Sequence, residues 1–260
     1  MLYYEMTGFM PGHRPDGDDD AIALPDPSDS ALLLDFDGTL VEIADRPMGV
    51  VVPARVPDLL SRAMDRMDGR VALVSGRTID DLETFLPGFD GNLIGTHGAE
   101  ARIDGTKSQT QDIDLATVSR LQRLVDDFAA LRPEFLVENK PSGVVLHYRQ
   151  AEEQAGLAMK FMDSLACASD GFRLQPALMA YELKPEGVGK DVGVRTLMGL
   201  PGFAGKTPIY AGDDLTDEAA MDVAQGLGGI GIKIGEAETV GRFRLAGPDA
   251  LVDVLEKWLA

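Results

Sequence analysis

The feature that most constrains the fold is a run of three leucines that leads directly into two aspartates and a glycine. Residues 32–34 are all leucine, and Asp35, Asp37 and Gly38 follow at once. An apolar run bounded by a turn signal is typical of a strand buried on both faces, the kind found in parallel sheets. We therefore predict an α/β protein whose parallel sheet contains a strand over 31–36.

The end of this strand is a candidate functional site. Ligands of open α/β sheets bind just outside the carboxyl ends of the strands, where Asp35 and Asp37 lie. Two acidic side chains this close repel each other unless a cation joins them or one holds a proton, and both arrangements suit phosphoryl chemistry. Gly38 permits a tight turn and the approach of a ligand to backbone N–H groups. The alternative is an ordinary surface turn, for which Asp-Gly is a common pair.

A second short apolar run, 71–74, also ends in polar residues. Ser75, Gly76 and Arg77 follow it, and Thr78 is a good N-cap for a helix that begins at the next residue. A hydroxyl and a guanidinium beside a helix N-terminus are typical of an anion site. The alternative is that Ser75 only caps the following helix.

A third run, 208–211, is predicted to be a buried strand that ends in a glycine and two more aspartates. Asp213 and Asp214 follow it, Thr216 is expected to be the N-cap of the next helix, and 217–218 would form an acidic first helical turn. The alternative for Asp213 and Asp214 is that they too serve only as helix caps.

Composition limits the partners and the compartment. The formal net charge of -19 over 260 residues argues against nucleic acid or an anionic membrane as the main partner. Cys167, the single cysteine, excludes an intramolecular disulfide, and its apolar helical surroundings predict a buried side chain. No apolar stretch approaches the length of a bilayer span, and the first ten residues lack a signal-peptide pattern. We expect a monomeric, cytoplasmic protein.

The alternation of strands and helices is interrupted in the middle of the chain. Residues 109–184 instead predict helix, hairpin, helix and hairpin, a compact α+β unit. We therefore predict a Rossmann-like core domain formed by 31–108 and 185–260, with an inserted α+β cap domain over 109–184. Residues 1–30, which are rich in proline and aspartate, are expected to form a mobile tail.

The polar residues at the strand ends suit one chemistry when they are taken together. They comprise four carboxylates, one serine and one lysine: Asp35, Asp37, Ser75, Lys190, Asp213 and Asp214. Such a set is suited to Mg²⁺ and a phosphate group. For Lys190, which opens a predicted helix, the alternative is the usual fate of lysine, a solvated surface position.

Each of these groups has a predicted role. Asp35 would attack phosphorus, and Asp37 would protonate the leaving group and then activate water. Mg²⁺ would be bound by Asp35 and Asp213 near Asp214, with the carbonyl of Asp37 as a third ligand. The phosphoryl oxygens would be bound by Ser75, Gly76 and Lys190.

Four motifs resemble those of the haloacid dehalogenase superfamily, in the family's order over residues 31 to 260. They are Asp35-Phe36-Asp37-Gly38-Thr39, Ser75-Gly76-Arg77, Lys190 and Gly212-Asp213-Asp214. The resemblance implies a Mg²⁺-dependent phosphatase that works through an aspartyl-phosphate. The position of the inserted segment, between the second and third motifs, resembles the branch with a large α/β cap.

Within that branch the chain resembles the trehalose-6-phosphate phosphatases. Besides the motifs above, the similar stretches are 96–100, 138–140, 147–149 and 184–190. The resemblance implies hydrolysis of trehalose 6-phosphate to trehalose and phosphate. It also implies substrate contacts from Arg77, His97, Gly98, Glu138, Lys140, Arg149 and Glu182. A lone histidine such as His97 is more often structural, and the cap residues could instead form cross-strand ion pairs on a solvated face.

Three other functions remain open from the sequence. The same core could serve a phosphatase of another phosphosugar, such as sucrose 6-phosphate or a mannosyl- or glucosyl-3-phosphoglycerate. It could serve a phosphosugar mutase, which returns the phosphoryl group to sugar instead of water. It could also be an inert phosphosugar sensor, although a sensor needs no acid/base aspartate.

Overall fold

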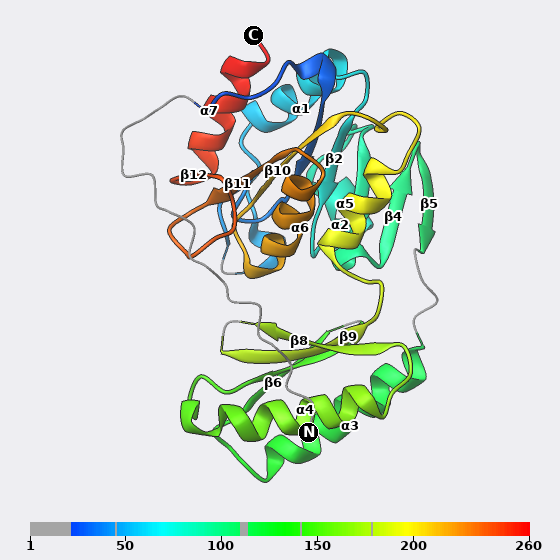
Figure 1. The fold of residues 1–260 in the computed structure, drawn as a ribbon, viewed down its shortest axis with the longest axis vertical. Helices are drawn as coiled ribbons and strands as arrows, with labels where there is room; N and C mark the ends of the chain where they lie inside the picture. Colours follow the sequence, from blue (N-terminus) through cyan, green and yellow to red (C-terminus); the bar gives the residue numbers. More distant parts are fainter. Residues whose placement is uncertain (1–21, 45, 110–113, 141, 178) are drawn as a thin grey trace.

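The computed structural model describes residues 22–44, 46–109, 114–140, 142–177 and 179–260. Two sheets organise these residues. One has eight strands in the order β12-β11-β10-β1-β2-β3-β4-β5, and the other has four in the order β6-β7-β9-β8. We call the first sheet with its helices the core, and the second sheet with α3 and α4 the cap; the cap lies below the core in Figure 1.

The mainly parallel core sheet and the separate α+β cap confirm the predicted fold class. The core strands are β1 (Ser30–Leu34), β2 (Val71–Val74), β3 (Asn92–Gly95), β4 (Glu100–Ile103), β5 (Thr106–Gln109), β10 (Thr207–Gly212), β11 (Ile230–Ile234) and β12 (Phe243–Leu245). The core helices are α1 (Arg55–Arg66), α2 (Ile79–Phe85), α5 (Lys190–Met198), α6 (Leu215–Gly226) and α7 (Pro248–Trp258). The cap contains α3 (Leu115–Ala130), β6 (Leu136–Lys140), β7 (Gly143–His147), α4 (Ala155–Cys167), β8 (Phe172–Ala177) and β9 (Ala180–Pro185).

The order of the core strands places a crevice beside β1. From β1 the chain proceeds through β2 and β3 on one side, and β10, β11 and β12 follow on the other side, all parallel to β1. The direction of progress therefore reverses between β1 and β10. Such a reversal opens a crevice at the carboxyl ends of the strands, and the residues that leave β1 and β10 at that end are Asp35 and Asp213.

The alternation of side chains along β1 divides the core into two apolar clusters. Leu32 and Leu34 pack with residues of α1, α2 and α7, while Leu33 packs with residues of α5 and α6 on the opposite face. All five residues of β1 are buried, as expected of a central parallel strand covered on both sides. The strand ends at Leu34, two residues earlier than predicted, so the first aspartate stands directly beyond it.

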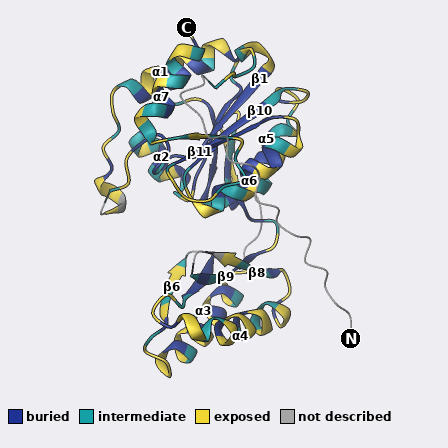
Figure 2. Cartoon of the chain, turned by 60° about the vertical axis from the view of Figure 1, so that its left-hand side comes forward, coloured by how far each residue is buried: buried dark blue, intermediate teal, exposed yellow. Residues whose placement is uncertain are grey.

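The cap sheet has one apolar and one polar face. Val144, Leu146 and Leu183 pack against α3 and α4 in the cap's own apolar cluster. Side chains at the alternate positions of the same strands point the other way, and these include Glu138, Lys140, Glu182 and Lys184. Figure 1 shows the helices on the side of the sheet away from the core, so the polar face is directed towards the core. Figure 2 shows the solvent-exposed outer surfaces of α3 and α4.

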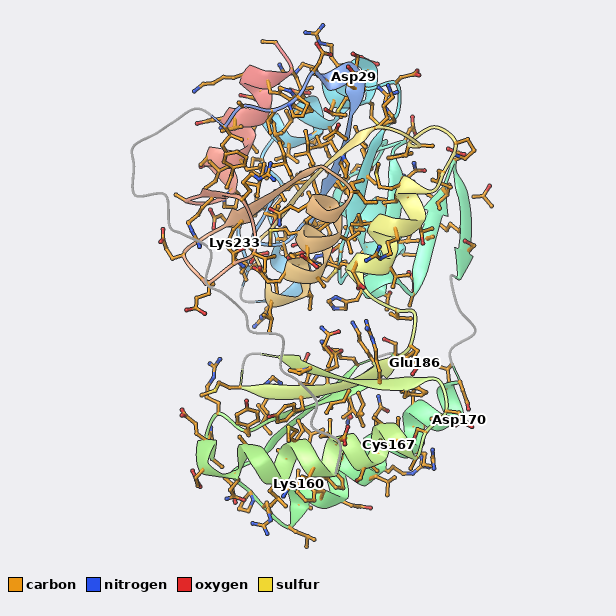
Figure 3. All side chains as sticks on the ribbon, in the orientation of Figure 1. Asp29, Lys160, Cys167, Asp170, Glu186 and Lys233 are labelled. Carbon is orange, nitrogen blue, oxygen red and sulfur yellow. The ribbon has the colours of Figure 1, made fainter. Side chains whose placement is uncertain are left out.

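Two predictions are wrong in the described residues. Residues 22–30 were expected in a mobile tail, but Ile22 and Leu24 pack against the core, and the Trp258 indole N–H donates to the Pro25 carbonyl. Cys167 was expected to be buried, but it is exposed near the end of α4 (Figure 3). Residues 1–21 lie outside the described part of the chain, and the domain boundaries stay a prediction.

Among the described residues, no helix combines the length and the apolar character that a membrane crossing requires.

Candidate active site

A buried ion cluster lies at the carboxyl ends of β1 and β10. The Lys190 ammonium, at the first residue of α5, lies 2.8 Å from Asp35 Oδ1 and 2.7 Å from Asp217 Oδ1. Asp217 is completely buried and also accepts a hydrogen bond from the Tyr210 hydroxyl. A lysine held by two carboxylates in the interior keeps a fixed position, because a buried charge without a partner is strongly unfavourable.

Burial and neighbouring charges act in opposite directions on this cluster. Burial raises the pKa of Asp35 well above its ordinary value, and Lys190 partly offsets that effect. Burial, followed by the neighbouring Asp217, raises the pKa of Asp213 as well. For Lys190, burial alone would lower the pKa, but Asp217 and Asp35 together raise it above the ordinary value. Lys190 therefore remains charged, and more positive charge is needed to keep both Asp35 and Asp213 ionised.

Three carboxylates come close enough to share one cation. Oxygen atoms of Asp35, Asp213 and Asp217 lie within 4.8 Å of one another. The Thr39 hydroxyl lies 3.4 Å from an oxygen of Asp35 and 3.4 Å from an oxygen of Asp213. Both oxygens of Asp217 are engaged, Oδ1 by Lys190 and Tyr210 and Oδ2 by the Asp214 N–H, whereas Lys190 contacts only Oδ1 of Asp35. The pair best suited to a metal is therefore Asp35 and Asp213. An all-oxygen donor set of this kind fits a hard divalent cation.

The second aspartate of the motif points to a different partner. Arg77 donates from Nε and from Nη2 to the two carboxylate oxygens of Asp37, both at 2.6 Å. The guanidinium also lies over the ring of Phe85, 4.7 Å from its centroid, and over that of Phe36, 5.6 Å away. A bidentate ion pair packed on two rings fixes the orientation of the Asp37 carboxylate.

The remaining core candidates surround the same crevice. Ser75 is buried at the end of β2, and its hydroxyl accepts a hydrogen bond from the Arg77 backbone N–H at 3.2 Å. Gly76 lies against His97, since a Cβ there would fall 2.6 Å from the imidazole. Gly98 packs against the residue before Lys190, where a Cβ would fall 2.6 Å from the Gly189 carbonyl oxygen. The structure thus brings Ser75, Gly76, His97 and Gly98, all predicted from the sequence, to one place.

His97 is held in an unusual state. Its backbone has a φ of 53°, in the left-handed region, and its Nδ1 is buried with no hydrogen-bond partner among the described residues. Burial, together with the charges of Lys190, Lys140 and Lys184, lowers the pKa of His97 to about 3. The imidazole is therefore neutral at physiological pH, and it lines a cavity between core and cap.

The N-cap predicted for α6 is wrong. Asp214, and not Thr216, is the N-cap of α6, and its carboxylate accepts from the Leu215 N–H. Asp217 completes a capping box with Asp214, since its Oδ2 accepts from the Asp214 N–H at 3.0 Å. Asp214 is therefore directed to the helix and lies outside the group of three carboxylates. The side chain of Asp37 also lies outside that group.

The cap candidates divide into two sets. Glu138 lies opposite Val145, which in turn lies opposite Glu182, so both acids occupy one row on the polar face of the sheet. Lys140 approaches Glu182 at 3.3 Å, and Glu138 lies 3.0 Å from His147 Nε2. The cross-strand ion pairs, which were the alternative to substrate contacts, are therefore present. The residues that form them lie on the face of the cap sheet that is directed towards the core.

Arg149 does not join these cap residues. Strand β7 begins at Gly143, opposite Lys140, and ends at His147, about 13 Å further along. Arg149 follows beyond that far end and is exposed in a turn.

One cavity connects the two halves of the molecule. From the core it is lined by His97, Lys190, Asp191 and Thr216, and from the cap by Ser142, Arg173, Gln175, Glu182 and Lys184, among others. It therefore reaches from the buried ion cluster to the polar face of the cap sheet. Figure 3 shows side chains projecting from β8 and β9 into the region between the sheets.

Sequence reasoning missed three residues of this site. Asp217 was interpreted as part of an acidic first helical turn, but it binds Lys190 in the interior. No local pattern distinguished it, because its partner Lys190 lies 27 residues away in the chain. Lys184 and Arg173 were also missed. Lys184 stands two residues after Glu182 in a strand, and period-two alternation predicts that they share a face.

Comparison with known proteins shows which family the chain resembles. The family model described as trehalose-phosphatase matches residues 33–248. A trehalose-6-phosphate phosphatase of Escherichia coli is 34% identical over 220 residues, which cover 84% of this chain and 83% of that protein. A probable trehalose-phosphate phosphatase of Sinorhizobium fredii is 34% identical over 206 residues, covering 79% and 77% of the two chains.

Solved structures give the same result for the fold. The crystal structure of a trehalose-6-phosphate phosphatase related protein is 28% identical, with a TM-score of 0.64 over 88% of this chain and 97% of the other. A trehalose-6-phosphate phosphatase of Aspergillus fumigatus aligns with a TM-score of 0.71 over 89% and 93% of the two chains, at 20% identity.

Proposed function

The chain belongs to the trehalose-phosphatase family, and from that premise we propose that it hydrolyses trehalose 6-phosphate to trehalose and phosphate. The observation that supports this most strongly is the position of Asp35. It lies at the crevice of the sheet with Lys190 at 2.8 Å, and it is one of three carboxylates able to share a cation. Two residues later, Asp37 is oriented by Arg77.

In the first half of the proposed reaction, Asp35 is the nucleophile. One of its oxygens forms a bond to phosphorus while the bond from phosphorus to the sugar oxygen breaks. Asp37, which enters this step in its protonated form, donates its proton to that leaving oxygen, which releases trehalose. The charge that spreads over the phosphoryl oxygens is balanced by Lys190, with the buried Ser75 hydroxyl as a further donor.

In the second half, water replaces the sugar. Asp37 takes a proton from a water molecule, whose oxygen attacks the phosphorus of the aspartyl-phosphate. The bond to Asp35 breaks, so free phosphate leaves and the carboxylate is restored. The two nitrogens that Arg77 places on Asp37 keep this carboxylate in one orientation for both proton transfers.

We assign the metal site to Asp35 and Asp213, with Thr39 beside both, and Mg²⁺ as the cation. The oxygen-only donor set and the raised pKa values of both carboxyls fit such an ion. When bound, Mg²⁺ supplies positive charge that offsets the repulsion among the carboxylates and the phosphate. Lys190 and Asp217 remain as the fixed internal pair beside it.

We propose that the polar face of the cap binds the disaccharide part of the substrate. Glu138, Lys140 and Glu182 offer directional donors and acceptors for sugar hydroxyls. Neutral His97 can bind a hydroxyl without adding charge. Arg149 would contact substrate only through a change of the cap's position, because it lies beyond the far end of β7. With a single cysteine the chain forms no intramolecular disulfide bond, which fits a reducing compartment, and we propose that the enzyme is cytoplasmic.

The test is phosphate release in Mg²⁺ from a panel of substrates. The panel contains trehalose 6-phosphate, sucrose 6-phosphate, glucose 6-phosphate, mannosyl-3-phosphoglycerate and p-nitrophenyl phosphate. We expect a strong preference for trehalose 6-phosphate and loss of release in EDTA, restored by added Mg²⁺.

Each other outcome has a distinct meaning. Preference for another phosphosugar would keep the core chemistry and overturn the roles of Glu138, Lys140 and Glu182. Isomer formation without free phosphate would indicate a mutase. Binding of trehalose 6-phosphate without any turnover would indicate a sensor.

A further inference from the structure

Two cations face each other across the cap sheet. Arg173 on β8 lies directly opposite Lys184 on β9. Side chains at directly opposed positions lie on the same face and close together, and like charges there destabilise the sheet. Both residues line the cavity that also reaches Lys190.

Neither cation forms an ion pair with a residue that the structure describes. Lys184 is only 7% exposed, yet no hydrogen bond or ion pair joins its ammonium to any other residue that the structure describes. Arg173 donates from Nη2 to the Val188 carbonyl at 3.3 Å, and its buried Nε has no partner among the described residues. The Val188 contact places the guanidinium beside the loop that leads to Lys190.

The nearby carboxylates do not remove this excess of positive charge. Glu182 is engaged by Lys140 at 3.3 Å, and Lys190 already holds Asp35 and Asp217. Asp191 remains as one acidic group lining the cavity, against the two cations. Burial, followed by the charge of Arg173, lowers the pKa of Lys184. In a chain with a net charge of -19, two cations in one cavity with no ion pair among the described residues indicate an anionic ligand.

We propose that Arg173 and Lys184 form an anion subsite of the cap, which binds a phosphate group across the cavity from Lys190. The ligand is a phosphate monoester or free phosphate, whose oxygens accept from both cations. The inference rests on the proposed function, because it places the substrate's phosphoryl group in this cavity. It adds that the cap recognises the phosphate as well as the sugar.

The test compares Lys184→Met and Arg173→Gln with Lys160→Met. Lys160 lies on the exposed side of α4, away from the core (Figure 3), so its variant removes one cap cation without touching the cavity. The probe is inorganic phosphate in Mg²⁺, with its Kd measured by calorimetry on the full chain. We expect a Kd raised about 10- to 100-fold in each cavity variant and unchanged in the control.

Thermal unfolding without phosphate separates this role from a structural one. Because the two cations repel each other in the free protein, the Tm of Lys184→Met without ligand should equal or exceed that of wild type. Phosphate should then raise its Tm less than it raises the Tm of wild type. A structural lysine would give the opposite result, a lower Tm with an unchanged response to phosphate.

Steady-state kinetics with trehalose 6-phosphate distinguishes the two sources of the anion. A subsite for the monoester raises KM about 10-fold or more in Lys184→Met. A subsite for free phosphate alone leaves KM unchanged and weakens only inhibition by the product.

The inference is overturned if both cavity variants bind phosphate within twofold of wild type, or if both fail to fold. A wild-type protein that binds phosphate through these cations but does not hydrolyse trehalose 6-phosphate would instead overturn the proposed function and leave the subsite in place.

Discussion

The ion cluster of the core and the polar face of the cap use charge in opposite ways. In the core, Lys190 is bound by two carboxylates and Asp37 is bound by Arg77 through two nitrogens. In the cap, Lys184 and Arg173 oppose each other across two strands, and Lys184 has no ion pair among the described residues. The core is thus organised before a substrate arrives, whereas the cap, beside pairs such as Lys140 with Glu182, keeps Lys184 and Arg173 for the proposed ligand.

This difference agrees with the tasks proposed for the two regions. Chemistry at phosphorus needs groups held in fixed positions, because reorganisation during the reaction slows it. Recognition of a mobile substrate can leave groups unpaired, provided that the ligand completes them. Variants of the two regions should therefore fail differently: those of the core lose rate or stability, and those of the cap lose affinity.

The largest effect is expected from Asp35→Asn. An amide has no charge with which to attack phosphorus, so kcat should fall about 10⁴-fold or more. The fold should survive with reduced stability, because Asp217 still holds Lys190 after the charge of Asp35 is removed. Phosphate release and a thermal melt measure the two quantities. Asp29→Asn, at an exposed acid outside the site (Figure 3), is the matched control, and substantial turnover by pure Asp35→Asn protein would contradict the mechanism.

Asp217→Asn should affect stability as well as rate. The substitution keeps the shape of the side chain but removes one of the two charges that hold Lys190. Breaking a buried ion pair from one side destabilises a protein by about 3 kcal/mol or more. Urea denaturation measures the free energy of unfolding. Asp222→Asn, at an exposed position of the same helix, should change it by less than about 0.5 kcal/mol. Equal stabilities for the two variants would show that Asp217 does not stabilise the cluster.

His97 should give the core an acid-dependent loss of stability. Its pKa is about 3 in the folded chain, below the ordinary 6.5, so the unfolded chain binds one more proton between these values. Stability from this residue is therefore complete above pH 6.5 and decreases as the pH falls towards 3. At pH 5 the loss relative to pH 7 is about 2 kcal/mol.

The variant His97→Asn tests this effect, since asparagine tolerates the left-handed backbone at this position. The free energy of unfolding of both proteins is measured by urea denaturation at pH 5 and pH 7. The difference between wild type and variant should change by about 2 kcal/mol between the two pH values. A difference that does not vary with pH would mean that His97 accepts a proton in the folded chain as readily as in the unfolded one.

The smallest effect is expected from Asp214→Asn, and it refines the metal assignment. Asparagine caps a helix as well as aspartate does, so the free energy of unfolding should hardly change. Because Asp214 lies outside the carboxylate group, the Mg²⁺ concentration that gives half-maximal activity should change by less than about threefold. Asp213→Asn should instead weaken activation by Mg²⁺ about 10-fold or more, because Asp213 belongs to the carboxylate group. Titration of activity with Mg²⁺ measures both, and reversed results would return Asp214 to the metal site.

Much of the fold followed from local patterns. Residues 32–34 and 71–74, both short apolar runs with polar ends, predicted buried parallel strands, and both are found in the centre of the core sheet. The positions of Asp35 and Ser75 directly after these runs predicted that both lie at the carboxyl ends of the strands. Such predictions succeed because a strand buried on both faces must be apolar throughout, and its ligand-binding end is fixed by the direction of the chain.

The partners of individual side chains could not be predicted in the same way. Asp217 looked like one acid in a helical turn, and Arg173 had no distinguishing local pattern. Asp217 pairs with Lys190 because α5 and α6 pack side by side, and Arg173 faces Lys184 because β8 and β9 pair in one register. Helix packing and strand register bring together residues that are distant in the sequence.

The sequence by itself determined the class of fold and the order of the motifs, and it predicted the residues now proposed for phosphoryl transfer, because each depends on a short stretch of chain. Only the tertiary structure decided which carboxylates form a group, which one caps a helix, and which cations have no ion pair in the part of the chain that is described. These outcomes depend on distances between elements, because the attraction between two charges falls as the distance between them grows.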